Sequence, residues 1–142
     1  MRYLIAVDGS VESDQAVEYA APHAAALDAT LEIAHVLEPE TELVDGEIVL
    51  PGGDRAMDIG EQVLNRARQR AVDHVASEEE LPTETKLLTG RPSDAIADYA
   101  DRADVDAVYV GHRGLSEERE QVVGSVAKSV VDKATVPVTV IR

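Results

Sequence analysis

The chain has no cysteine, no tryptophan and no phenylalanine, and aromatic residues make up only 3% of its 142 residues. Without cysteine it can form no disulfide, no thiolate metal site and no cysteine nucleophile. Without large aromatic side chains its core has to be built from Val, Ile, Leu and Ala, which suits a Val-rich sheet covered by Ala-rich helices. The length is that of one compact domain with a substantial core.

Long apolar runs are also absent from the sequence. The opening run YLIAV is too short for a signal peptide, and no stretch approaches the ~18 apolar residues of a membrane-spanning helix. We therefore expect a cytoplasmic protein that does not bind membranes.

Basic residues are few, and only three of them are lysines. With 28 acidic residues against 13 basic ones, the formal net charge is −15. Such a charge repels DNA, RNA and anionic membranes, so we expect no nucleic-acid partner. Two causes are open: an acidic face for a partner, or life in concentrated salt, where charges are screened beyond about 3 Å at 1 M. Because the acidic residues are spread along the whole chain, we favour adaptation to salt.

Apolar runs typical of strands alternate along the chain with segments of helical periodicity. We expect strands at residues 3–7, 30–36, 83–88, 106–111 and 136–141, and helices at residues 11–27, 57–77, 90–103 and 125–134. Pro22 should kink the first helix or lift its first turn. The alternation predicts right-handed βαβ crossovers, and therefore one α/β domain over residues 1–142: a three-layer α/β/α sandwich around a five-stranded parallel sheet.

The polarity of the strands indicates their order in the sheet. The third strand is polar at residues 83–86, which suits an edge, and the fifth contains Pro137, which is tolerated at a strand start or an edge. The first and fourth strands are apolar throughout, as central strands should be. The order 3-2-1-4-5 satisfies these conditions. It places a ligand crevice at the carboxyl ends of the first and fourth strands, where the winding reverses.

The connection at residues 37–54 is long for a loop between a strand and a helix. Its apolar arms around Asp45 and Gly46 are compatible with a small hairpin. A surface excursion and a ligand lid are both open interpretations, and we favour the first.

The spacing G-x2-G-x9-G-S follows the fourth strand, at Gly111, Gly114, Gly124 and Ser125. Gly111 can make a turn that a Cβ would forbid, and Gly114 lets backbone N–H groups converge on an anion. Gly124 permits close approach of a ligand, and Ser125 stands at a helix N-terminus that can bind phosphate. The same residues could be ordinary turn glycines and an ordinary helix cap. The spacing alone leaves both interpretations open.

Other chemistry finds less support in the sequence. The glycine element lacks the Gly-Lys-Ser/Thr ending of a Walker A loop, and no histidine is spaced for a hydrolase triad or a metal site. We expect His23 and His74 on helix surfaces and His35 packed. His112 lies in the glycine element, where contact with a ligand and exposure to solvent are both open, and we favour exposure to solvent. Asp8 could simply cap the next turn, but its place at the inferred crevice favours a functional role.

With these motifs the chain resembles the universal stress proteins along its whole length. The resemblance rests on the first strand ending in Asp8, on AHV at the end of the second, on GRPSDAI, on the G-x2-G-x9-G-S element and on the final ATVPVTVIR. It implies the strand order 3-2-1-4-5, a stress-response or regulatory role, and a homodimer joined through the last strand, between Val136 and Ile141.

The resemblance also implies an adenine-nucleotide site that takes ATP, or AMP, usually with Mg²⁺. Asp8 and the backbone at Val36 would hold the adenosine end, and the glycine element would surround the ribose and phosphates. The implied cofactor-binding residues are Asp8, Val36, Gly111, Arg113, Gly114, Gly124, Ser125 and Val126. We expect no catalytic residue and no protein metal site, and at most slow ATP hydrolysis, because the sequence shows no general base and no metal-binding acid pair beyond Asp8.

The spacer between the glycines departs from the family, because it carries Glu117, Glu118 and Glu120 where basic or small residues are common. A charge pair at ~4 Å in water is worth about 1 kcal/mol, and Arg113 and Arg119 offset part of the repulsion. We therefore expect nucleotide affinity to be weakened and not abolished. A nucleotide-free dimeric scaffold of the same fold stays open as the alternative. An adenylate-transferring enzyme ranks last, because the chain has no second domain to hold a cosubstrate.

Overall fold

A computed structural model describes residues 1–38, 42–44, 46–49, 54–76, 80–112 and 124–142. The order of elements is β1 (Arg2–Ala6), α1 (Val11–Ala26), β2 (Thr30–Leu37), β3 (Glu42–Val44), β4 (Glu47–Val49), α2 (Asp54–Asp73), β5 (Thr83–Thr89), α3 (Pro92–Arg102), β6 (Ala107–Gly111), α4 (Ser125–Lys133) and β7 (Val138–Ile141).

The main sheet has the strand order β5-β2-β1-β6-β7, and its neighbouring strands are all parallel. In the numbering of the five expected strands this is 3-2-1-4-5, so the predicted fold is confirmed. The polar strand β5 lies at one edge, and β7, which begins just after Pro137, lies at the other. The winding reverses between β1 and β6, which are hydrogen-bonded neighbours.

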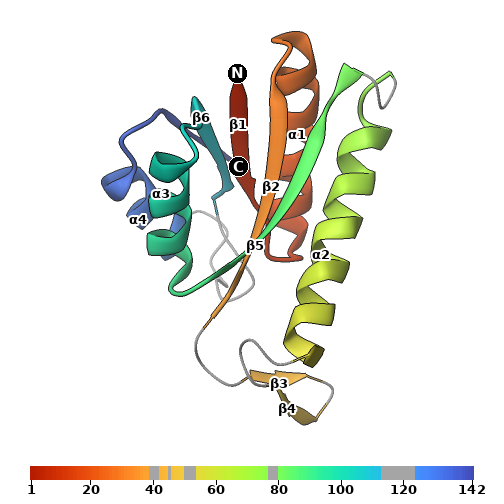
Figure 1. Ribbon diagram of the computed structural model, residues 1–142, viewed down its shortest axis with the longest axis vertical. Helices are drawn as coiled ribbons and strands as arrows, with labels where there is room; N and C mark the ends of the chain where they lie inside the picture. Colours follow the sequence, from red (N-terminus) through yellow and green to blue (C-terminus); the bar gives the residue numbers. More distant parts are fainter. Residues whose placement is uncertain (39–41, 45, 50–53, 77–79, 113–123) are drawn as a thin grey trace.

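Helices cover both faces of this sheet (Figure 1). On one face, α1 and α2 pack over inward residues of the sheet such as Ile5, Leu31 and Ile33, all 0% exposed. On the other face, α3 and α4 pack over Leu4 and Val108, which are also 0% exposed. Both clusters consist mainly of aliphatic side chains, as the lack of large aromatic residues requires.

The helix boundaries differ from the expected ones where periodicity alone decided them. Helix α2 begins at Asp54 and ends at Asp73, so it starts and stops earlier than the expected 57–77. The apolar repeat marks the buried face of a helix, whereas capping and neighbouring turns decide its ends. Helix α1 continues through Pro22 to Ala26, although a kink or a lifted first turn was expected there.

The long connection between β2 and α2 forms the expected hairpin. Strands β3 and β4 pair antiparallel around Gly46, whose φ of +82° is a left-handed conformation that suits glycine. The other turn residue, Asp45, lies outside the described residues. In Figure 1 the hairpin lies apart from the main sheet, beyond the carboxyl end of β2.

Candidate functional site

A tight turn at Asp8, Gly9 and Ser10 connects β1 to α1. The Ser10 N–H donates a hydrogen bond to the Asp8 Oδ1 atom at 2.9 Å, and the Ser10 Oγ atom caps α1 by accepting from the Ser13 N–H at 3.1 Å. Gly9 has a φ of +84°, which side chains other than glycine rarely adopt. The turn therefore holds the half-buried Asp8 just beyond the carboxyl end of β1.

Strand β6 ends at Gly111, and α4 begins directly after Gly124. The backbone of His112 connects three elements: its N–H donates to the Ile141 carbonyl at 2.8 Å, and its carbonyl accepts from the Gly124 N–H. Gly124 is buried and is the N-cap of α4, with no side-chain cap. One interpretation of the sequence made Ser125 the N-cap of this helix. That interpretation is wrong, because Ser125 is the first helical residue. The two glycine ends of the G-x2-G-x9-G-S element lie together.

The start of α4 has the geometry of an anion site. The backbone N–H groups of a helix's first turn are not used by the helix itself, and they form the positive end of its dipole. Both residues that open the helix, Ser125 and Val126, are exposed, the latter to 38%. Helix N-termini of this kind are common binding places for phosphate.

The Asp8 turn and the end of β6 lie at the same end of the sheet, where its parallel strands have their carboxyl ends. Strands β1 and β6 run parallel with Ile5 opposite Tyr109, so the Asp8 turn and Gly111 follow neighbouring strand ends at the switch point. Val36 lies near the end of β2, on the other side of β1, and is half-buried. Two further predicted site residues, Arg113 and Gly114, lie outside the described residues, as do the three spacer glutamates.

The histidines follow three of the four expectations. His23 and His74 are exposed, and His35 is packed with its Nδ1 atom 2.8 Å from the Val7 carbonyl oxygen. The expectation that His112 faces solvent is wrong, because this residue is only 6% exposed. Its backbone hydrogen bonds to β7 and to Gly124 at the start of α4 fix its position. The place of His112 in a glycine-rich segment did not indicate this burial.

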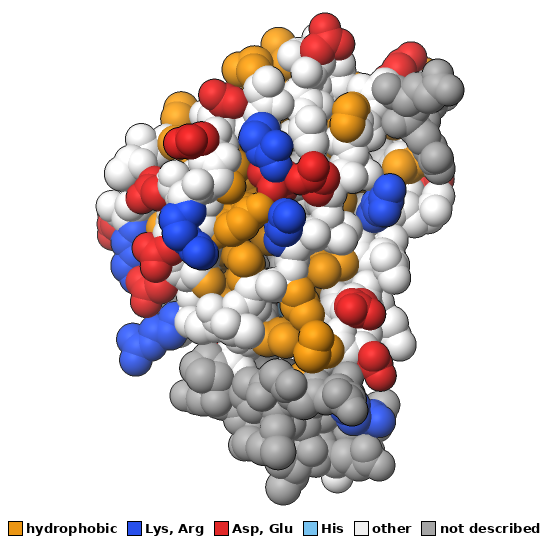
Figure 2. All heavy atoms as spheres, in the orientation of Figure 1, with side chains coloured by type: hydrophobic (Ala, Val, Ile, Leu, Met, Phe, Trp, Pro, Cys, Tyr) orange, Lys and Arg blue, Asp and Glu red, His pale blue; other side chains and the backbone are white. Residues whose placement is uncertain are grey.

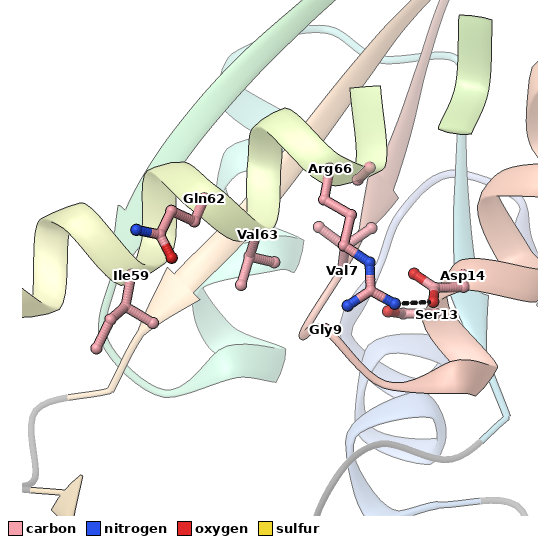
Figure 3. Close-up of a pocket in the computed structure, with 9 residues that line it drawn as sticks. Val7, Gly9, Ser13, Asp14, Ile59, Gln62, Val63 and Arg66 are labelled. Carbon is pink, nitrogen blue, oxygen red and sulfur yellow. Dashed lines mark hydrogen bonds and ion pairs between the residues drawn. The ribbon is translucent and has the colours of Figure 1, made fainter. Parts of the chain in front are cut away.

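A cavity of about 200 Å³ lies beside the Asp8 turn, between α1 and α2. Figure 3 shows Ile59, Gln62, Val63 and Arg66 of α2 on one side, and Val7, Gly9, Ser13 and Asp14 on the other. The Arg66 side chain extends across the cavity, and its Nη2 atom donates a hydrogen bond to the Asp14 Oδ2 atom at 2.6 Å. Since ligand pockets usually measure ~300–1,000 Å³, this cavity can hold no more than part of a ligand. The sequence did not indicate it, because its walls come from segments about 50 residues apart.

No cluster of three or more His, Asp or Glu side chains that could hold a metal ion occurs among the described residues. A magnesium ion that arrives with a nucleotide does not need one. Mg²⁺ is commonly held by one or two carboxylates together with the phosphates of the substrate.

A polar cluster at the opposite end of the sheet was missed by the sequence analysis. Glu32 of β2 is 0% exposed and accepts hydrogen bonds from Arg2 Nε at 3.1 Å and from the Tyr99 hydroxyl at 2.6 Å. Arg2 also donates to Glu84 at 2.9 Å. Burial works against the charge of Glu32, but the bonds from Arg2 and Tyr99 outweigh it and hold the pKa of this carboxyl below its usual value. Burial and the bond to Glu32 raise the pKa of Tyr99 to about 12.

Comparison with known proteins decides the family. The family model described as "Universal stress protein family" matches residues 1–142. The chain belongs to the universal stress protein family. A universal stress protein of Thermus aquaticus is 32% identical over 139 residues, which cover 98% of this chain and 96% of that protein.

Solved universal stress proteins share the fold. One, determined in complex with cAMP, is 27% identical with a TM-score of 0.75 and aligns over 100% of this chain and 96% of that one. Another, from Archaeoglobus fulgidus in complex with dAMP, is 25% identical with a TM-score of 0.75 and aligns over 100% of this chain and 98% of that one. The resemblance stated from the sequence is confirmed. No helix within the described residues is long and apolar enough to cross a membrane.

Proposed function

We propose that this universal stress protein binds an adenine nucleotide in the crevice between the ends of β1 and β6, and acts through that binding in a stress-response or regulatory role. One observation carries the proposal: the Asp8 turn and the Gly124 start of α4 follow neighbouring strands at the switch point of the sheet. The relatives solved with cAMP and dAMP support it, because both ligands are adenine nucleotides.

The two turns suit opposite ends of such a ligand. The phosphates would meet the N–H groups at the start of α4, with Ser125 and Val126 at its exposed rim. The adenosine end would lie toward Asp8 and the backbone of Val36, which follow β1 and β2. Gly111 and Gly124 leave room beside the ligand, and Arg113 and Gly114 complete the proposed set.

The proposed ligands are ATP and AMP, with Mg²⁺ accompanying the triphosphate. When bound, Mg²⁺ would neutralise phosphate charge, held mainly by the phosphate oxygens and by water. We propose binding and at most slow hydrolysis. The sequence carries neither a Walker A ending nor a hydrolase triad, and the residues of the crevice bind and orient the nucleotide.

We further propose a homodimer joined through β7. This strand is at the edge of the sheet, and its residues are half-buried within one chain. An edge with valines at 138 and 140 exposes hydrogen-bonding groups beside apolar side chains, which pairing with a second copy would cover. Light scattering at working salt should give twice the chain mass, and a monomer would contradict this.

Salt adaptation and a cytoplasmic location complete the proposal. The acidic residues are spread along the whole chain, which supports adaptation to salt, and Figure 2 shows acidic side chains at several places on the visible face. At a net charge of −15 the folded chain repels itself, and concentrated salt screens that repulsion.

Calorimetric titration with AMP, ATP and Mg-ATP in molar KCl tests the proposal. We expect binding by the wild type, and affinity reduced by about tenfold or more in Gly114→Val and Ser125→Ala, which remove a backbone nest and a phosphate-binding hydroxyl. The matched control is Ser129→Ala, one turn further along α4, which should bind like the wild type.

An absence of binding heat, together with no nucleotide released by acid from the purified protein, would refute nucleotide binding. The alternative, a nucleotide-free dimeric scaffold, would then account for the glutamates of the spacer.

A further inference from the structure

Val7 lies between the end of β1 and the Asp8 turn, and both its backbone N–H and its carbonyl bond to residues of β2. The Val7 N–H donates to the Ala34 carbonyl at 2.8 Å, and the Val7 carbonyl oxygen lies 2.8 Å from the Nδ1 atom of His35. A carbonyl oxygen can only accept, so the Nδ1 atom of His35 carries the hydrogen. The bond therefore fixes the tautomer of the neutral ring as the Nδ1–H form.

Helix α2 confines the imidazole of His35. A Cβ atom at Gly60 would lie 3.3 Å from the His35 Cδ2 atom and 2.7 Å from the Leu87 Cδ1 atom. The missing side chain of Gly60 thus makes room for a half-buried ring between β2 and α2. A ring packed in this way is a rigid donor, because it cannot turn away from Val7 without displacing its neighbours.

The bond from His35 reaches the Asp8 turn through a single peptide group. The Val7 carbonyl and the Asp8 N–H belong to the same plane, so fixing one fixes the direction of the other. The Asp8 N–H in turn points to the Oγ atom of Ser13, a buried residue of α1, at 3.4 Å. This peptide group is therefore held by His35 at its oxygen and by Ser13 at its nitrogen.

We propose that His35 is a positioning residue for the nucleotide site: it sets the Asp8 turn by orienting the Val7–Asp8 peptide, and does so as an N–H donor. The inference rests on the proposed function for its effect on binding. Its structural part, the dependence of the turn on the donor, stands without a ligand.

Two substitutions separate the donor from the packing. His35→Leu keeps an apolar group of moderate size but removes the hydrogen bond. His35→Asn keeps an N–H two bonds from Cβ, at the branch position of Nδ1. We expect AMP affinity about five- to tenfold lower in His35→Leu and within about twofold of the wild type in His35→Asn. The matched control is His74→Leu, since His74 Nδ1 also bonds a carbonyl, that of Arg70, at 2.8 Å, but at the far end of α2.

Nitrogen-15 NMR of the ligand-free protein tests the structural part. The wild type should show His35 with its proton on Nδ1, and the backbone amide signals of Asp8, Gly9 and Ser10 should shift in His35→Leu and stay near their wild-type positions in His35→Asn. Unfolding curves ensure that each variant is measured in its folded range.

The outcomes distinguish the two proposals. Undisturbed turn signals in His35→Leu, or equal weakening of binding in both His35 variants, would overturn the role of His35 even if the wild type binds nucleotide. A wild type that binds no nucleotide would refute the proposed function, while a turn that still responds to the donor would support the positioning role.

Discussion

At the amino end of the sheet, Arg2, Glu32 and Tyr99 satisfy one another, whereas at the carboxyl end Asp8 and Gly124 shape turns of the backbone. The first cluster joins side chains from β1, β2 and α3 around a fully buried carboxylate. The second region offers a glycine turn, a helix N-terminus and an exposed Ser125. Removing one partner from the first cluster would leave a buried charge uncompensated, whereas backbone donors at the exposed start of a helix are free to meet a ligand.

The largest expected effect comes from a substitution in the cluster of Arg2, Glu32 and Tyr99 at the amino end of the sheet. Arg2→Met leaves the buried Glu32 carboxylate with the Tyr99 hydroxyl alone. We expect a loss of about 2 kcal/mol in the free energy of unfolding, less than for a fully buried pair, since the Arg2 side chain is 40% exposed. Urea unfolding measures it.

Nucleotide affinity should be unchanged in the folded Arg2→Met variant. Glu84→Gln is the control, because it removes only the exposed partner of Arg2, and should cost less than about 1 kcal/mol. A stability loss in the control as large as that in Arg2→Met would show that the buried carboxylate is not the cause.

The next effect comes from the carboxyl end. Asp8→Ala removes the acceptor of the Ser10 N–H and the carboxylate of the crevice, so we expect AMP affinity to fall about tenfold. Asp8→Asn retains the acceptor oxygen of the turn and should lose less. Calorimetric titration of the wild type, Asp8→Ala and Asp8→Asn with AMP measures both losses of affinity. If Asp8→Ala bound AMP like the wild type, Asp8 would not be part of the nucleotide site.

The smallest effect concerns the hydroxyl of Tyr99. Tyr99→Phe removes one donor to Glu32 and should cost about 1 kcal/mol at pH 7. With its pKa raised to about 12, the hydroxyl stays protonated, and so remains a donor, throughout the neutral range.

The same variant has a signature in acid. Because the folded-state pKa of Glu32 is lowered, its contribution to stability is present above the unfolded-state pKa and is lost as the pH falls through the folded-state pKa. Without Tyr99 that loss should be smaller and occur at higher pH. Unfolding free energies between pH 7 and pH 3 measure the change, and superimposable acid profiles would contradict it.

The order of the strands could be predicted because each clue is local. Polar residues 83–86 mark one edge, Pro137 marks the other, and the apolar first and fourth strands belong at the centre. The positions of Asp8, Gly111 and Gly124 could be predicted for a related reason. In a parallel sheet the carboxyl ends of all strands lie at the same end of the sheet. The position of a motif that follows a strand can therefore be predicted from the topology.

Contacts between distant segments could not be predicted in this way. Glu32 lies within the apolar run of β2, and its partners Arg2 and Tyr99 are 30 and 67 residues away in the sequence. The bond from His35 to Val7 spans 28 residues and depends on the room that Gly60 of α2 leaves. No periodicity encodes such pairs, since they arise where separate elements meet.

The α/β class and the order of the strands followed from the sequence alone, because hydrophobic periodicity and turn residues act over a few neighbouring positions. The three-dimensional packing alone revealed that Glu32 is buried among partners, that His112 is buried and that His35 bonds the Val7 carbonyl. These outcomes depend on which side chains three-dimensional packing brings within hydrogen-bond distance, and burial makes each such bond obligatory.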